Sequence, residues 1–373
     1  MKWVLNILRW VVGITFIFSG LIKADDPLGL SYKMLEFFEA WGFHFFDNYT
    51  LTASVIMNVF EVLAGVAVIV GWQMRFFSWF LLGLILFFTY LTAYVLFSGK
   101  IKECGCFGNC IPLSGIQTFV KDIVLLLMIL LLLLNAKHIH PLLNNTAAPM
   151  VLFGSIVVSI LLQVHVLKHL PFFDCLPYKK GSNLIEEMKV PQGAIADSFS
   201  IVFKYKKNQK IVEFDQAHFP ADFDSTYEFI DRFDKLIRKG NAEPLISDFN
   251  LRTLAGNDTT AAILPLNAIW FMCKDFDRPA AYWKEQFNMI DSLAKLYHLP
   301  LFVITALPDE ASAIFLANKV CILKCDATVI KTAARVQPTY FLMQQGTVIS
   351  KCSYADVTTF KNAVEKFMQN KQH

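Results

Sequence analysis

The stretch "FFSWFLLGLILFFTYLTAYVLFSGKIKECGCFGNC", residues 76–110, decides the fold of the first half of this chain. Residues 76–97 are almost entirely apolar, and as a helix they are long enough to cross the roughly 30 Å hydrocarbon core of a bilayer. A polar, glycine-containing loop follows at once, and it places three cysteines within seven positions: Cys104, Cys106 and Cys110. The stretch predicts a membrane span that ends in a cysteine loop.

The composition of the whole chain agrees with a membrane protein. The chain is 55% hydrophobic and only 17% charged, which is too apolar for an ordinary soluble protein. Its length of 373 residues leaves room for two domains. The net charge is only +3, and no run of lysine or arginine makes a local basic patch. We therefore expect a lipid bilayer as a partner and no nucleic acid.

Four further runs of similar length precede residue 170. Each can satisfy its backbone hydrogen bonds internally as a helix, as a bilayer demands. The first run is preceded by a lysine, but "FIFSGLIKADDP", residues 16–27, has no small-x-small cleavage site, so we expect a retained helix rather than a signal peptide. The four runs are 3–22, 51–71, 117–135 and 149–168.

The charges of the short loops predict an orientation. Lys2, Arg9, Arg75 and Lys137 fall on one side if the helices alternate, and the positive-inside rule puts that side, with the amino terminus, in the cytoplasm. Five crossings then carry the cysteine loop and everything after residue 170 to the other side. In a bacterial inner membrane this is the periplasm, where disulfides are stable.

The segment "LSYKMLEFFEAWGFHFF", residues 30–46, has its apolar residues at helical spacing. This pattern is typical of a helix that lies in the headgroup layer. A helix that packs as a cap over the bundle would show the same pattern, and both alternatives remain open.

Polar residues are rare inside the predicted spans. Glu61 is the clearest, with Asn58 one turn earlier, and an ionisable group at that depth is costly unless it is partnered or functional. The two residues are candidates for a quinone or substrate contact, or for a buried hydrogen bond that locks the bundle. Asn58, Tyr90, Thr92 and Tyr94 are the candidate partners of Glu61, and Gln163 and His165 are expected at the membrane interface.

The cysteine loop favours redox or disulfide chemistry over metal binding. Zinc sites use four well-separated ligands, whereas Cys104 and Cys106 are separated by one residue and no histidine lies in the loop, so no metal is expected. Gly105 and Gly108 allow a tight fold that brings Cys110 near Cys104 or Cys106. Such thiols could exchange with a partner protein or with a quinone in the lipid, or one structural disulfide could pin the loop.

Three stretches together resemble the DoxX and MauE group of small four-helix membrane proteins. They are "RWVVGITFIFSGLIKADDPLG" (9–29), "NVFEVLAG" (58–65) and "TYLTAYVLFSGKIKECGCFGNC" (89–110), and "CGCFG" is the most specific part. The resemblance covers about residues 3–135. The whole arrangement, including "DCLPYKKGSNL" (174–184) after the last helix, resembles a DoxX-family membrane protein of the Bacteroidetes type. The resemblance implies a helical bundle linked to envelope redox chemistry: maturation of a disulfide-rich periplasmic dehydrogenase subunit for MauE, and quinone-linked oxidation for DoxX.

The remainder of the chain is predicted to be extracytoplasmic. Residues 199–215 alternate around a polar turn and predict a β-hairpin. From residue 264 the order βαβα followed by ββα resembles thioredoxin. In that fold a proline before the hairpin is cis, and Pro338 in "RVQPTYF" occupies this place, so the bond before Pro338 is our candidate cis peptide.

One departure from thioredoxin is important. Cys273 stands near the first position of the expected C-x-x-C, but Phe276 occupies the second, so no disulfide can form within that motif. Cys273 is therefore a weak candidate redox thiol. A single cysteine at the end of a strand is more often a buried thiol without a redox role. Cys321 and Cys325 would be too far apart to bond on an extended strand. The pairing of the remaining cysteines, including Cys175 and Cys352, stays open.

These observations predict a DoxX/MauE-like transmembrane bundle over 1–140, a fifth membrane helix over 141–170, a linker with a β-hairpin over 171–263, and an α/β thioredoxin-like domain over 264–373. Two functions fit this plan. The first is a membrane thiol–disulfide or quinone-linked redox protein that works through the cysteine loop. The second is a non-enzymatic scaffold or assembly factor that binds a periplasmic protein through a degenerate thioredoxin-like domain.

Overall fold

The structure is a computed structural model that describes residues 2–99, 101, 105, 107–108, 110–111, 113–195, 198–238, 240 and 242–372. The chain divides into two compact units. Unit 1 combines residues 1–182 with 250–373, and unit 2 is the intervening segment 183–249. Each unit is described by itself.

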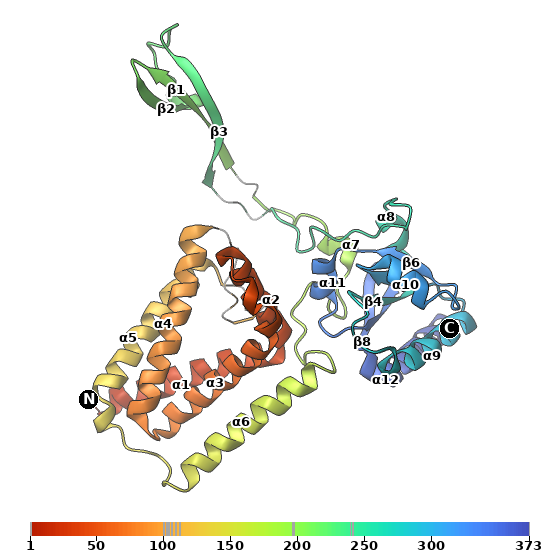
Figure 1. Ribbon diagram of the computed structural model, residues 1–373, viewed down its shortest axis with the longest axis horizontal. Helices are drawn as coiled ribbons and strands as arrows, with labels where there is room; N and C mark the ends of the chain where they lie inside the picture. Colours follow the sequence, from red (N-terminus) through yellow and green to blue (C-terminus); the bar gives the residue numbers. More distant parts are fainter. Residues whose placement is uncertain are drawn as a thin grey trace. The chain divides into compact units, whose positions relative to one another are not determined.

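Unit 1 begins with a helical bundle (Figure 1). The described residues contain five helices long and apolar enough to cross a membrane, at the positions that the hydrophobic runs predicted. Helix α3 contacts α1, α4 and α6, and α5 contacts α4 and α1. The five helices are α1 (Lys2–Asp25), α3 (Thr50–Val70), α4 (Met74–Ser98), α5 (Gly115–Leu134) and α6 (Ala147–Val166).

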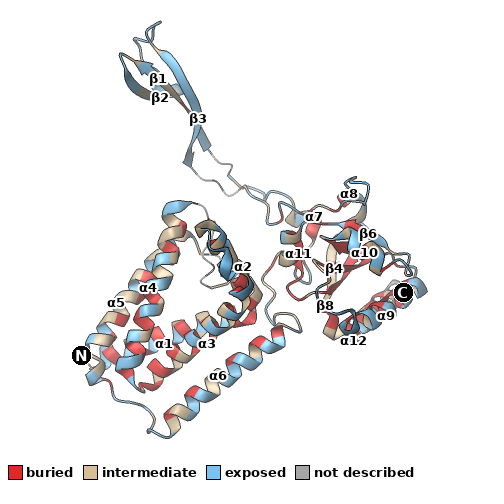
Figure 2. Cartoon of the chain, in the orientation of Figure 1, coloured by how far each residue is buried: buried red, intermediate tan, exposed pale blue. Residues whose placement is uncertain are grey.

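The bundle helices bury one stripe of residues and expose apolar side chains elsewhere. Figure 2 shows the exposed residues of these helices on their outward surfaces. The exposed large side chains include Phe18, Trp79, Leu127 and Val158. Many large apolar side chains exposed on several helices are unfavourable in water, whereas a bilayer accommodates them. The protein is therefore an integral membrane protein.

Helix α2 (Pro27–Trp41) follows α1 and packs on the bundle as a cap. Its start is fixed by Asp26, whose carboxylate accepts from the Gly29 N–H at 2.9 Å, and by proline at the first helical position. Phe37 is buried against Tyr94 of α4, with ring centroids 6.2 Å apart. This packing agrees with the cap alternative. A short helix η1 (His44–Tyr49) then leads into α3.

The end of the bundle at which α1, α4 and α6 end and α3 and α5 begin is called the loop end below. It carries α2, the cysteine loop and the segment that leads to the rest of unit 1. At the other end, Arg9 donates to the carbonyl of His140 at 3.1 Å and also contacts the carbonyl of Ile69. A short helix η2 (Ala136–His138) lies in the connection between α5 and α6.

The second part of unit 1 is an α/β domain built on a five-stranded sheet of order β6-β5-β4-β7-β8. Strand β4 pairs in parallel with β5 and antiparallel with β7. The strands are β4 (Ala268–Cys273), β5 (Leu301–Thr305), β6 (Cys321–Lys324), β7 (Thr339–Gln344) and β8 (Thr347–Ser353). The helices are α8 (Thr260–Ile263), η4 (Ala280–Tyr282), α9 (Lys284–Leu296), α10 (Pro308–Ile314), α11 (Ala327–Ala333), η5 (Tyr354–Asp356) and α12 (Val357–Gln372).

The central strands of this sheet are buried on both faces. Every residue of β4 and β5 is buried, which is typical of parallel strands covered on both sides. One face packs Phe271 against Phe287 of α9 and Tyr340 against Phe360 of α12. The Gln337–Pro338 peptide bond is cis, as the sequence predicted.

The loop end of the bundle, residues 171–182 and the α/β domain are joined by hydrogen bonds and ion pairs. The carboxylate of Asp25 accepts from the backbone N–H groups of Phe172 and Phe173, at 2.9 and 3.0 Å. Arg335 pairs with Asp26 at 2.9 Å, Lys351 with Asp174 at 2.5 Å, and His169 with Asp356 at 2.8 Å. Burial lowers the pKa of Lys351, and burial raises the pKa of Tyr32 to about 12.

Unit 2 contains a three-stranded antiparallel sheet of order β2-β1-β3. The predicted hairpin is confirmed as β1 (Ser198–Lys207) and β2 (Lys210–Asp215), and a third strand, β3 (Glu228–Arg238), was not predicted. Phe214 and Tyr205 stack at 5.4 Å and form the centre of an aromatic cluster. The remaining helices of the unit are α7 (Leu184–Glu187) and η3 (Gln216–His218).

Candidate functional site

The site begins with a close approach of α1 and α3. A Cβ on Gly13 would lie 2.8 Å from the Gly65 carbonyl oxygen, and one on Gly65 would lie 2.7 Å from the Gly13 carbonyl oxygen. Small residues let membrane helices come this close. About two turns further along α1, Gly20 also lies close to α3, because a Cβ on Gly20 would be 2.8 Å from a side-chain carbon of Val62 and 3.1 Å from the Cβ of Glu61. The side chain of Lys23 therefore meets α3 at Glu61.

Lys23 and Glu61 form an ion pair that is almost completely removed from solvent. The side chains are 2% and 0% exposed, and the Lys23 Nζ contacts the Glu61 Oε1. The second carboxylate oxygen, Oε2, has no hydrogen-bond partner among the described residues. The ammonium also lies over the ring of Phe88, 4.7 Å from its centroid. Burying two charges costs several kcal/mol per ion before their attraction offsets it, so this pair needs an explanation beyond packing.

The partners expected for Glu61 were wrong, because the actual partner is Lys23 of α1. The sequence does not reveal this pairing because Lys23 stands at the end of its run, where a lysine normally reaches the membrane surface. Asn58 instead donates to Gln163 of α6 at 3.0 Å, and Gln163 donates to the carbonyl of Ser159 at 3.2 Å. Gln163 is fully buried rather than interfacial, whereas His165 is exposed. Asn58 thus locks α3 to α6.

A second buried carboxylate was missed by sequence reasoning. Asp122 of α5 is 1% exposed, accepts from the Thr92 hydroxyl at 3.1 Å and pairs with Lys121 at 3.1 Å. Lys121 lies over the ring of Phe107 in the cysteine loop, 4.4 Å from its centroid. The available signal was the "KD" pair, residues 121–122, inside the apolar run 117–135.

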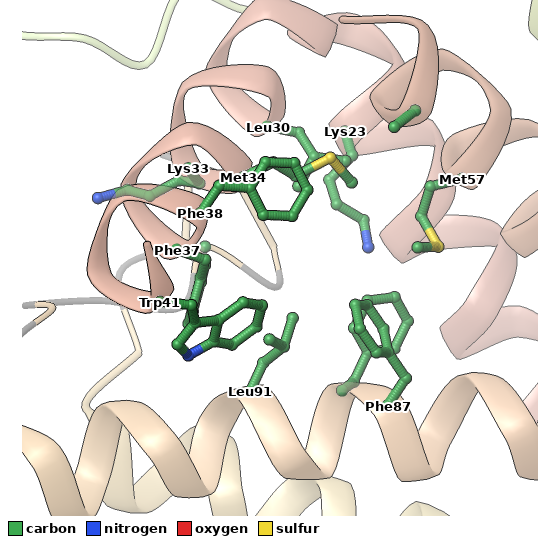
Figure 3. A pocket seen from close by; sticks show the side chains of 13 residues that line it. Lys23, Leu30, Lys33, Met34, Phe37, Phe38, Trp41, Met57, Phe87 and Leu91 are labelled. Carbon is green, nitrogen blue, oxygen red and sulfur yellow. The ribbon is translucent and has the colours of Figure 1, made fainter. Parts of the chain in front are cut away.

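A pocket of about 170 Å³ lies beside Lys23 at the loop end, between α2, α3 and α4. Figure 3 shows Lys23, Met57 and Phe87 pointing into it, while the ammonium of Lys33 points away. Phe87 is 41% exposed on the outer surface of α4, so the pocket borders the lipid-facing surface. The rest of the lining is largely apolar and comprises Leu30, Met34, Phe37, Phe38, Trp41, Ala53, Phe88, Leu91 and Gly105.

Gly105 connects this pocket to the cysteine loop. It lies between Cys104 and Cys106 in the sequence, and both cysteines fall outside the described residues. Gly105 has a φ of +71°, and a Cβ there would lie 3.4 Å from the Cγ of Lys33. The backbone between the two cysteines therefore lines the pocket.

The third cysteine of the loop is in a disulfide. Cys110 bonds to Cys175, with 4.9 Å between their Cα atoms. The sequence left the pairing open, and the structure pairs Cys110 with Cys175 because the segment after the fifth membrane helix lies at the same end of the bundle. The bond ties the loop to the segment that leads into the α/β domain.

The α/β domain has no accessible redox site at the position predicted for one. The thiol of Cys273 is buried and donates to the carbonyl of Asp275 at 2.7 Å. Burial strongly raises the pKa of Cys273, so little thiolate exists at neutral pH. Next to it, the Nε of Arg278 donates at 3.1 Å to the carbonyl of Gln337, the residue before the cis proline.

The remaining described cysteines are free. Cys321 is exposed, whereas Cys325 and Cys352 are buried. Burial raises the pKa of Cys325 to about 12 and also raises the pKa of Cys352. Within the described parts of the chain, no group of three or more histidine, cysteine or acidic residues is arranged to hold a metal ion.

Comparison with protein families assigns the region that contains the pocket. Residues 1–135 match the family described as methylamine utilisation protein MauE. The MauE-family domain thus includes Lys23, Glu61, Asp122 and the three loop cysteines, but not Cys175. Residues 199–239, in unit 2, match a domain of unknown function, DUF8463. Neither the curated proteins nor the solved structures gave a match.

Proposed function

We propose that this protein is a thiol–disulfide oxidoreductase of the inner membrane, which passes electrons from thiols through Cys104 and Cys106 to a quinone in the pocket of the MauE domain. The amino terminus would lie in the cytoplasm and the α/β domain in the periplasm. The observation that carries the proposal is the pocket itself. It combines a lipid-facing border, a buried ammonium group and the backbone of the residue between two cysteines.

The size and lining of the pocket suit a single lipophilic ring. Sites for drug-sized ligands are about 300–1,000 Å³, so a volume of about 170 Å³ is small for an ordinary organic cofactor. The aromatic side chains can stack against a flat ring. The ammonium of Lys23 can donate a hydrogen bond to a carbonyl oxygen and stabilise negative charge on it.

The reaction balances without a metal. The two thiols form a disulfide and release two electrons and two protons, and the quinone takes up two electrons and two protons to become a quinol. The new disulfide then exchanges with the dithiol of a partner, which regenerates the two thiols of the loop.

The α/β domain would bind that partner rather than supply electrons. Its strand order, its closing β7–β8 hairpin and the cis bond before Pro338 support thioredoxin likeness. The buried Cys273 and the Arg278 contact with Gln337 also favour the second candidate function, a scaffold that binds a protein without redox chemistry.

Quinone binding can be tested directly, because Trp41 lines the pocket. The full chain in lipid nanodiscs is titrated with menadione, and quenching of tryptophan fluorescence is measured. Quenching should saturate in the wild type and shrink in Trp41→Phe, while Trp79→Phe, a change on the exposed surface of α4, should keep the quenching of Trp41. Absence of saturable quenching would contradict the quinone site.

Electron transfer is tested by adding the reduced protein to menadione and following quinol formation. Cys104→Ser and Cys106→Ser should each abolish it, while Cys321→Ser should have no effect. If the double variant Cys104→Ser/Cys106→Ser binds menadione and still reduces it, the loop is not the electron donor. If the wild type binds menadione but transfers no electrons from its thiols, the scaffold function is favoured.

A further inference from the structure

A second, smaller cavity is also lined by Lys23, and Asp122 is part of its lining. Lys23, Asp122 and Thr15 are among its lining residues, and its volume is about 20 Å³. A cavity of about 10–15 Å³ or more can hold one water molecule if polar partners are present, and here an ammonium, a carboxylate and hydroxyl groups provide them. Lys23 therefore contacts Glu61 of α3 directly and shares a water-sized space with Asp122 of α5.

We propose that Asp122 is the positioning residue that returns protons to Lys23 from the aqueous side of the cysteine loop. The inference rests on the proposed function, since the quinone in the pocket is the final proton acceptor. When Lys23 gives a proton to a carbonyl oxygen of the bound quinone, the Lys121 ammonium would transfer a proton to the Asp122 carboxylate, and Asp122 would pass it through the shared cavity to Lys23. Lys121, whose side chain is partly exposed, would then take a proton from water.

The electrostatics of the cluster drive this return step. Once Lys23 has given up its proton, Glu61 is left as a fully buried carboxylate with no cation, which is strongly unfavourable. Reprotonation of Lys23 restores the ion pair. Glu61 is less suited to supply that proton itself, because it has 0% exposure, whereas Asp122 contacts Lys121, whose side chain is 23% exposed.

Each carboxylate oxygen of Asp122 has its own neighbour, which fixes the orientation of the side chain. The Thr92 hydroxyl donates to its Oδ2 at 3.1 Å, while the Lys121 ammonium lies 3.1 Å from Oδ1. Lys121 in turn lies over the ring of Phe107 in the loop. Among the described residues, the charged groups that line this cavity are Lys23, Lys121 and Asp122, and Glu61 is paired with Lys23.

The test compares Asp122→Asn and Asp122→Glu with the wild type, as full chains in nanodiscs. Menadione affinity, read from Trp41 quenching, should be unchanged in both variants, because Asp122 does not line the pocket. Quinol formation by the reduced protein should slow by about 100-fold in Asp122→Asn, the usual contribution of a proton-transfer group. Asp122→Glu should restore most of the rate, and the wild type should show a solvent deuterium isotope effect that Asp122→Asn alters.

The outcomes separate the two claims. Failure of the wild type to bind or reduce menadione overturns the proposed function. A wild type that turns over, with a wild-type rate and pH profile in Asp122→Asn, overturns only the role of Asp122. Loss of menadione binding in Asp122→Asn also overturns it, since that result shows a structural role. If Asp122→Asn fails to fold, the absence of a solvent deuterium isotope effect on quinol formation by the wild type decides against the inference.

Discussion

Removal of one partner from the Lys23–Glu61 pair should destabilise the bundle more than any other single polar change in it. Both side chains are at most 2% exposed, so Glu61→Leu leaves an ammonium, and Lys23→Met leaves a carboxylate, without a counter-charge in a low-dielectric interior. Breaking a buried pair in this way costs about 3–5 kcal/mol. Replacing both partners by apolar side chains is often neutral, so the double variant should be close to the wild type.

The assay is thermal unfolding of the full chain in detergent, followed by tryptophan fluorescence and helical circular dichroism. A loss of about 3–5 kcal/mol lowers the midpoint by roughly 10 °C in a domain of 150–250 residues. Glu39→Gln, a change at an exposed glutamate of α2, is the matched control and should leave the midpoint in place. The reasoning is refuted if Glu61→Leu and Lys23→Met each unfold within about 1 kcal/mol of the wild type, the size of an exposed pair. The reasoning is also refuted if the loss of stability in the double variant equals the sum of the losses in the two single variants.

Three further changes test other parts of the structure. Gly65→Leu should reduce the stability of the bundle by about 1–3 kcal/mol or more and lower its thermal midpoint, because the Cβ would clash with a carbonyl of α1. Gly83→Leu should leave the midpoint in place, because a Cβ at Gly83 meets nothing within 4 Å. Cys110→Ser with Cys175→Ser opens a loop of 65 residues and should cost about 4 kcal/mol, measured by chemical unfolding against the oxidised wild type. Asp326→Ala should cost about 1 kcal/mol at pH 7 by removing the N-cap of α11. Backbone N–H donors lower the pKa of Asp326 from 3.8, so its stabilisation is present above that pH and disappears as the pH falls through the lowered value, where the variant and the wild type should converge.

The membrane spans could be predicted from the sequence because one physical property defines them. A helix of about 20 apolar residues must satisfy its own backbone and can face lipid, so composition and length alone reveal it. The residue ranges of the five helices follow the hydrophobic runs closely. The hairpin β1–β2 was likewise predictable from the alternation around a polar turn. The cis bond before Pro338 was expected from the resemblance to thioredoxin.

The site was less predictable because its contacts join helices far apart in sequence. Glu61 was recognised by its depth, but its partner depends on how closely α1 and α3 approach, which Gly13 and Gly65 determine. Asp122 was missed because the run 117–135 is apolar enough to be taken as an ordinary membrane span, and the burial of Asp122 depends on how α5 packs against α4. The pairing of Cys110 with Cys175 depends on the return of the fifth membrane helix to the loop end, and nothing in the cysteine spacing indicates it.

Burial separates the roles of the cysteines. Cys273, Cys325 and Cys352 lie inside the α/β domain, and burial raises the pKa of each, so these thiols are poor nucleophiles at neutral pH. Cys110 is committed to a disulfide that fixes the loop to the following segment. If the protein exchanges electrons through thiols, Cys104 and Cys106 are the candidates, because Gly105, which separates them in the sequence, lines the pocket that the Lys23 ammonium enters. Under the proposed function, the α/β domain would contribute contacts to a partner, while the chemistry would belong to the membrane bundle.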